Sequence, residues 1–259
     1  MEESPPNLPH DSPQPKQQDA HECGLATPPY HGIADLDSRD IQALSSLYTP
    51  SAFAKIWFTA QKGLARPSPP TLYPEYTKPG GTEYVYRELD FWTSGFFPGC
   101  LYLLLERQRK HGHVLGSAAS TSQEKVPHHL QLSFACTWWT ENLHQNATLA
   151  TTHDLGFMIL PWAGPAWSLH GDARAFDTIR TAAETLASRF SPTLGCIRSW
   201  DTCVTKKYNF SDPDSDFLVI IDNMMNLNLL FTAASLTSSP RLRDVAVAHA
   251  RRTQQTHSA

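Results

Sequence analysis

The sequence lacks the features of several large classes of protein. It has no run of eighteen apolar residues, and its first twenty residues have no apolar core of the kind that a signal peptide needs. No block of lysine or arginine stands out, and the formal net charge is −4, which disfavours a nucleic acid or an anionic membrane as partner. Glycine-rich nucleotide loops and the GxSxG elbow of hydrolases are also missing. We therefore expect a cytoplasmic protein.

Cysteine and histidine are too scattered to predict a metal site. The five cysteines are odd in number and lie far apart, without the spacing of a zinc knuckle, so we interpret them as reduced thiols. Two histidine pairs, His111 with His113 and His128 with His129, have no further ligands near them in the sequence. The sequence predicts no bound metal.

Proline and glycine divide the chain into segments. Residues 1–35 are rich in proline and poor in large apolar residues, which predicts a disordered tail before one domain over residues 36–259. Two further stretches, 65–88 and 111–126, are rich in Pro, Gly, Ser or Thr and are expected to be irregular.

The remaining sequence alternates between two kinds of helical pattern. Amphipathic segments carry an apolar stripe, such as Phe176, Ile179 and Leu186, opposite charged residues, whereas the other segments are apolar nearly all round and must be covered on every side. Such alternation predicts an all-α fold, a double-walled ring of about three and a half helical hairpins. The amphipathic segments are 41–62, 127–143, 172–190 and 240–255, the apolar ones are 92–108, 154–167 and 222–236, and the best strand signal is FLVII at 217–221.

Each apolar segment opens with polar or aromatic residues. Trp92, Asp154 and Asp222 lie at these openings, one per hairpin, so parallel inner helices would bring them to one rim. Two carboxylates near the flat faces of Trp92 and Trp200 suit glycoside chemistry, because one can donate a proton while the other positions water. Crowding of two carboxylates also keeps one of them protonated near neutral pH.

Simpler interpretations compete with this one. An aspartate at a helix start is commonly an N-cap, and a tryptophan is commonly a core residue. His153 could be a buried core histidine with Asp154 as its partner. An α-hairpin scaffold that binds other proteins is a further alternative. The matched positions of Asp154 and Asp222 in successive apolar helices favour a functional role.

Four segments together resemble the unsaturated glucuronyl hydrolases of glycoside hydrolase family 88. They are YTKPGGTEYVYRELDFWTSGFFPGCLYLLLE, THDLGFMILPWAG, IRSWD and LVIIDNMMNLNLLF, in this order, within residues 36–255. The resemblance implies an (α/α)6 barrel that removes a 4,5-unsaturated uronic acid from lyase-generated oligosaccharides by hydration of the double bond. It implies no metal or organic cofactor.

The resemblance also implies roles for five residues. Asp222 matches the general acid/base and Asp154 the second essential carboxylate. His153, Trp92 and Trp200 match residues that contact the substrate.

The chain departs from the family at its C-terminal side. Family members continue with further hairpins that carry another active-site histidine and a segment of the type WSRGQAW, and nothing similar is present here. We therefore expect an incomplete (α/α)6 barrel with exposed apolar flanks, unstable or self-associating and weakly active. The alternatives are a related unsaturated rhamnogalacturonyl hydrolase and a non-catalytic fragment, pseudoenzyme or sugar-binding remnant; the oligomeric state is not predicted.

Overall fold

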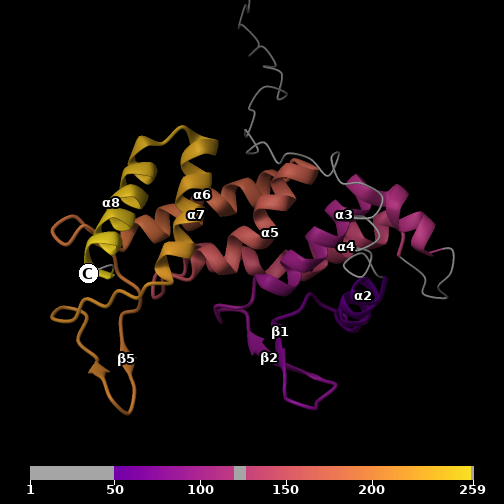
Figure 1. Ribbon diagram of the computed structural model, residues 1–259, viewed down its shortest axis with the longest axis horizontal. Coiled ribbons are helices and arrows are strands. Elements are labelled where there is room, and N and C mark those ends of the chain that lie inside the picture. The colour runs from indigo at the N-terminus through magenta and orange to yellow at the C-terminus, as the bar shows by residue number, and fades with distance from the viewer. Residues whose placement is uncertain (1–49, 120–126, 258–259) are drawn as a thin grey trace, which may run out of the picture. The chain divides into compact units, whose positions relative to one another are not determined.

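Helices make up most of the part of the chain that the structure describes, as Figure 1 shows. The computed structural model describes residues 50–119 and 127–257, so the predicted tail 1–35, the domain start at residue 36 and residues 41–49 lie outside the described residues. The helices are Pro50–Leu64 (α2), Phe96–Ala119 (α3), His129–Thr140 (α4), Leu155–His170 (α5), Ala173–Ser188 (α6), Asn223–Thr237 (α7) and Pro240–His257 (α8), with a 3-10 helix at Glu141–Thr148 (η3).

The helices form two walls, as the alternation of patterns predicts. Helix α5 packs between α3 and α7, and these are the three apolar helices. Their amphipathic partners cover them from one side: α2 and α4 contact α3, α6 contacts α5 and α7, and α8 contacts α7. Helix α6 begins where predicted, because the Asp172 carboxylate accepts hydrogen bonds from the backbone N–H groups of Arg174 and Ala175. The described residues thus hold three and a half hairpins.

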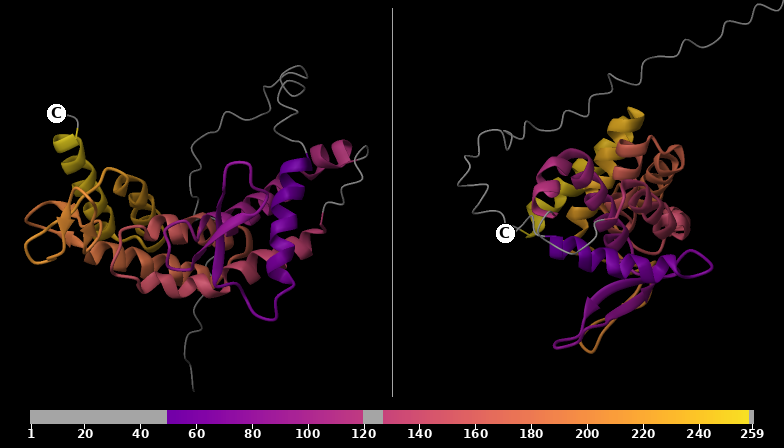
Figure 2. Two further views of the ribbon diagram at one scale, coloured as in Figure 1. Left: turned by 90° about the horizontal axis from the view of Figure 1, so that it is seen from below. Right: turned by 90° about the vertical axis from the view of Figure 1, so that its right-hand side faces the viewer.

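Three short antiparallel hairpins connect the helices. Strands Leu72–Thr77 (β1) and Tyr84–Glu88 (β2) pair, as do Phe190–Ser191 (β3) with Cys196–Ile197 (β4) and Cys203–Val204 (β5) with Asn209–Phe210 (β6). In Figures 1 and 2 the β1–β2 and β5–β6 hairpins project from the same side of the helices.

Two expectations about irregular segments were wrong. Residues 65–88 contain the β1–β2 hairpin, which the buried Tyr73 anchors by packing edge-on against Trp139. Helix α3 continues through Ala119, because Gly, Ser and Thr lower helix propensity without ending a helix as proline does. The weak strand signal at 217–221 corresponds to no strand, in line with the all-α prediction, and the N–H of Ile220 donates to the Ser199 hydroxyl.

Glycine allows the starts of the inner helices to approach closely. A Cβ on Gly95 would lie 2.4 Å from the carbonyl oxygen of Phe157, and one on Gly156 would lie 2.6 Å from Asn226 Oδ1. The same Asn226 Oδ1 accepts a hydrogen bond from the Phe157 N–H at 3.0 Å. These contacts hold the N-terminal ends of α3, α5 and α7 together.

The described residues belong to one unit of the chain, 43–259. Within the described residues, no helix combines the length and the apolar character needed to cross a bilayer. The cysteines of this part, Cys100, Cys136, Cys196 and Cys203, are unpaired, as predicted.

Substitution of Gly156 tests the close contact between α5 and α7. We expect Gly156→Ala to lower the free energy of unfolding by about 1–3 kcal/mol, because the new methyl group would overlap Asn226. Gly164→Ala in the same helix is the control, since its Cβ would meet only Leu160 Cδ1 at 3.6 Å and alanine favours the helix by about 0.5–1 kcal/mol. Urea unfolding measures both, and equal effects would contradict the close-packing interpretation.

The environment of the His144 side chain predicts how the stability of the fold depends on pH. Its Nδ1 lies 2.6 Å from Thr178 Oγ1, whose own hydrogen goes to the Arg174 carbonyl, so the imidazole is the donor. Burial, with a further contribution from the charge of Arg174, lowers the pKa of His144 from 6.5 to about 4. A lowered histidine pKa means that the unfolded chain takes up the proton first, so stability is complete above pH 6.5 and falls as the pH drops towards 4.

The measurement is urea unfolding at several pH values, beside His144→Asn. We expect the wild-type free energy of unfolding to fall across this window by less than about 1.4 kcal/mol per pH unit relative to the variant, because the ring is only partly buried. Parallel pH profiles for the two proteins would refute this assignment.

Candidate active site

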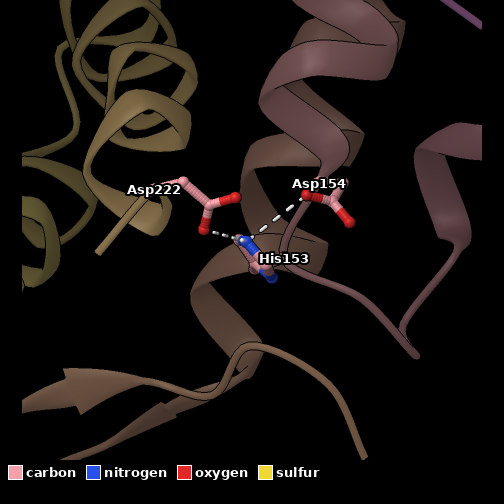
Figure 3. Close-up of side chains that lie close together, drawn as sticks. All are labelled: His153, Asp154 and Asp222. Carbon is pink, nitrogen blue, oxygen red and sulfur yellow. Dashed lines mark hydrogen bonds and ion pairs between the residues drawn. The ribbon is translucent and has the colours of Figure 1, made fainter. Parts of the chain in front are cut away.

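His153 is the centre of the site. Its side chain is fully buried, and its Nδ1 lies 3.0 Å from the carbonyl oxygen of Ser199. Its Nε2 lies 3.1 Å from Asp222 Oδ1 and 3.3 Å from Asp154 Oδ1. Figure 3 shows the two carboxylates on either side of the imidazole, one from the start of α5 and one from the start of α7.

The hydrogen bonds of His153 determine where its protons lie. A carbonyl oxygen can only accept, so Nδ1 carries a hydrogen that it donates to Ser199. The Nε2 atom then either donates to a carboxylate as an imidazolium or accepts from a protonated carboxyl group. His153, Asp154 and Asp222 are thus close enough to exchange a proton, which is the arrangement that acid and base chemistry requires.

Neither carboxylate caps its helix. Asp154 and Asp222 occupy the N-cap positions of α5 and α7, but their side chains make no capping hydrogen bond, unlike that of Asp172 on α6. Asp154 Oδ2 instead accepts from Thr152 Oγ1 at 2.6 Å. The simple N-cap interpretation is therefore wrong for both residues. Their exposure differs, because the side chain of Asp222 is 46% exposed and that of Asp154 only 10%.

A cavity of about 410 Å³ opens over Asp154. Trp92 and Trp200 both line it, as does Asp201. The Trp92 ring packs edge-on against Phe96 and Phe157. The centroids of the Trp200 and His153 rings lie 5.3 Å apart. The structure thus brings together all five predicted site residues. Asp222 is not among the residues that line this cavity, but it contacts His153, which in turn contacts Asp154 and Trp200 of the cavity wall.

Arg189 is a residue that sequence reasoning missed. Its guanidinium is almost fully buried and donates to the carbonyl oxygens of Ala150 and Ser199 and to the Asp201 carboxylate. Burial lowers the pKa of Arg189, while Asp201 opposes this effect. By donating to both Ala150 and Ser199, Arg189 ties the loop before α5 to the loop that carries Trp200. The Ser199 carbonyl also accepts from His153. Nothing in the sequence distinguishes Arg189 from Arg174 and Arg180 of the preceding helix α6.

The same acidic cluster is the part of the described structure where a metal could bind. The ligand atoms of His153, Asp154 and Asp222 lie within 4.8 Å of one another. Their mutual hydrogen bonds account for the arrangement without an ion, so the absence of a metal stays a prediction of the sequence. His128 has another role, because its Nδ1 accepts from the Leu130 N–H at the start of α4. The side chains of His111 and His113 lie outside the description.

Comparison with known proteins agrees with the resemblance seen in the sequence. No family model matches the chain. The unsaturated glucuronyl hydrolase of Formosa agariphila is 34% identical over 163 residues, which cover 62% of this chain and 34% of that protein. The unsaturated chondroitin disaccharide hydrolase of Streptococcus agalactiae is 29% identical over 177 residues, or 68% of this chain and 38% of that protein.

A solved structure extends the similarity to three dimensions. The crystal structure of an unsaturated glucuronyl hydrolase specific for heparin matches 79% of this chain with a TM-score of 0.58 and 28% identity. The chain is similar to unsaturated glucuronyl hydrolases in sequence and in fold. Since those structures are (α/α)6 barrels, the predicted incomplete barrel is confirmed. The chain spans about a third of the length of these curated relatives and 46% of the solved chain.

Substitution of Arg189 tests its role in holding the site loops. We expect Arg189→Gln to lower the free energy of unfolding by about 3–5 kcal/mol, because Asp201 and three carbonyl groups lose a buried partner. Arg180→Gln, on the exposed face of α6, should change the free energy of unfolding by less than about 0.5 kcal/mol. Urea unfolding with tryptophan fluorescence measures both, and a mild effect at Arg189 would show that the loops are held by other contacts.

Proposed function

We propose that this site removes a 4,5-unsaturated uronic acid from the non-reducing end of lyase-generated oligosaccharides. The observation that carries the proposal is the pair of carboxylates, Asp154 and Asp222, that share one buried imidazole beside a tryptophan-lined cavity. The relatives are named as hydrolases of unsaturated glucuronyl and chondroitin disaccharide substrates, which supports the same reaction class.

In the proposed reaction, the double bond of the sugar is hydrated. The Asp222 carboxyl group donates its proton to C4 of the vinyl ether, and a water molecule that loses a proton to the resulting carboxylate adds to C5. The product is a hemiketal, which opens and releases the rest of the oligosaccharide. The greater exposure of Asp222 favours it for this role, because an acid must reach the sugar.

Asp154 has the complementary role in this proposal. Its carboxylate is nearly enclosed and fixed by Thr152, so it serves as a constant negative charge beside the developing oxocarbenium-like centre. The His153 imidazole keeps the two carboxylates at a set spacing, and Trp92 and Trp200 offer flat faces to the sugar ring. No metal or organic cofactor takes part.

The inner helices α3 and α7 carry large apolar side chains that are exposed, among them Leu103, Met225 and Phe231. Such a surface favours self-association or instability of this stretch of chain, which would lower its activity in isolation. A sugar-binding fragment without turnover is the second candidate, and unsaturated rhamnogalacturonan fragments are the alternative substrate. A cytoplasmic location also stays a prediction.

The test is an assay that follows the loss of ultraviolet absorbance of the double bond in an unsaturated glucuronyl disaccharide. We expect slow turnover by the 259-residue chain and faster turnover once any downstream coding sequence is added. Asp222→Asn should reduce the rate about 10²–10⁴-fold, because it removes the proton donor.

The site of proton transfer provides a second measurement. In heavy water, the product should carry solvent deuterium at C4, whereas direct displacement at the glycosidic bond would leave C4 unlabelled. Turnover that survives Asp222→Asn, or an unlabelled product, would refute the proposal. Turnover of the chain alone that matches full-length relatives would instead refute the expected impairment.

A further inference from the structure

A separate cavity of about 410 Å³ lies where the β3–β4 hairpin, residues 217–219 and the C-terminal end of α8 meet. None of the residues that line the cavity over Asp154 lines this one. Leu194, Phe217 and Val219 give it an apolar wall, and none of the described residues that line it is acidic. Its volume falls within the range of small-molecule sites in proteins, which is about 300–1,000 Å³.

A buried hydroxyl group without a partner lines this cavity. Thr253 is 4% exposed, and its Oγ1 makes no hydrogen bond within the described structure. The other buried threonines of the described helices differ, because Thr59, Thr140 and Thr178 each donate to the backbone carbonyl four residues earlier. Since a buried polar group normally has a partner, the Thr253 hydroxyl can donate to a ligand in the cavity.

The cavity also has one positively charged side chain. Arg252 lines it, and the Arg252 Nε donates to the Leu194 carbonyl at 2.9 Å, which fixes the guanidinium beside the hairpin turn. Among the described residues no carboxylate pairs with Arg252, so its two terminal nitrogens can bind a ligand. A guanidinium matches the shape of a carboxylate, to which it donates two parallel hydrogen bonds.

The remaining wall is uncharged and largely preformed. Cys196 is 7% exposed, and burial raises the pKa of its thiol, so this group is uncharged at neutral pH. The guanidinium carbon of Arg198 lies 4.6 Å from the centre of the Phe217 ring, and Arg198 donates to the carbonyl oxygens of Pro213 and Asp216. These contacts hold the ring in place before a ligand binds, which lowers the entropic cost of binding.

We propose that this cavity binds a small monocarboxylate with an apolar body, such as an aromatic acid. Arg252 pairs with the carboxylate, and the Thr253 hydroxyl donates to one of its oxygens. The apolar body packs against the Phe217 ring and its aliphatic neighbours. The site is independent of the proposed function, because no residue of the cluster around His153 lines it.

The experiment is a calorimetric titration of the 259-residue chain with 3-phenylpropanoate, beside its uncharged amide, 3-phenylpropanamide. We expect the carboxylate to bind about tenfold more tightly than the amide, because only the carboxylate forms a charged pair with Arg252. Asp222→Asn should leave the affinity for the carboxylate unchanged, which distinguishes this cavity from the site around His153.

Variants of α8 test the charged contact. Arg252→Gln should weaken binding of the carboxylate about tenfold and leave that of the amide unchanged. Arg252→Lys keeps the charge and should retain part of the affinity. Arg251→Gln is the matched control, an exposed neighbour that does not line the cavity, and it should change neither affinity.

A stability measurement tests the hydroxyl group without a ligand. Thr253→Val should weaken binding of the carboxylate about fivefold. It should not lower the urea midpoint of unfolding, because the hydroxyl has no hydrogen bond to lose. Thr140→Val is the matched control and should lower the midpoint, since the Thr140 hydroxyl donates to the Cys136 carbonyl.

Five results would overturn this site. Three concern the ligand: equal affinities for the carboxylate and the amide, no binding of the carboxylate up to about 10 mM, and loss of its binding in Asp222→Asn. The fourth is an unchanged affinity in Arg252→Gln. The fifth is a fall in the urea midpoint of Thr253→Val as large as that of Thr140→Val, which would show that the hydroxyl already has a partner.

Discussion

The buried imidazole of His153 is the constraint on which the site depends. A buried ring nitrogen without a partner is costly, so both nitrogens must find hydrogen bonds inside the protein. One is satisfied by the Ser199 carbonyl, and the other by carboxylates from the starts of α5 and α7. Because these partners come from three separate segments, the ring fixes two helix ends and one loop relative to one another. The close approach of Gly156 to Asn226 permits this geometry.

The chemistry and the stability of the barrel are distributed differently along the chain. The carboxylates, the imidazole and the tryptophans all come from the hairpins described here, so the groups proposed to react are assembled by less than half of the solved relative's length. The apolar inner wall, in contrast, leaves Leu103 and Met225 exposed. A barrel buries its inner helices only when its walls close, whereas the site needs only the ends of two neighbouring helices and the loops beside them.

The connecting loops do more than join helices. Arg189 binds backbone carbonyl groups on both sides of the cavity, and its buried charge is matched by Asp201. The β5–β6 hairpin extends the same loop into a second aromatic hollow beside Trp200. The helix ends therefore supply the two carboxylates, while the loops determine the shape of the space in which a ligand would lie. Such a division is common where a scaffold supports variable binding loops.

Periodicity in the sequence predicted the helices and their alternation, because a helix buried on one side carries an apolar stripe and a helix buried on all sides is apolar all round. The same patterns placed Asp154 and Asp222 at the starts of buried helices. They did not determine what those carboxylates do. An N-cap and a catalytic acid look the same in sequence, and only the folded chain shows that neither residue caps its helix and that both reach His153. Arg189, the β1–β2 hairpin and the cavity behind Trp200 were likewise decided by tertiary contacts. The contact of Arg189 with Ala150 and that of Tyr73 with Trp139 join segments far apart in the chain, and local patterns carry no information about which distant groups will meet.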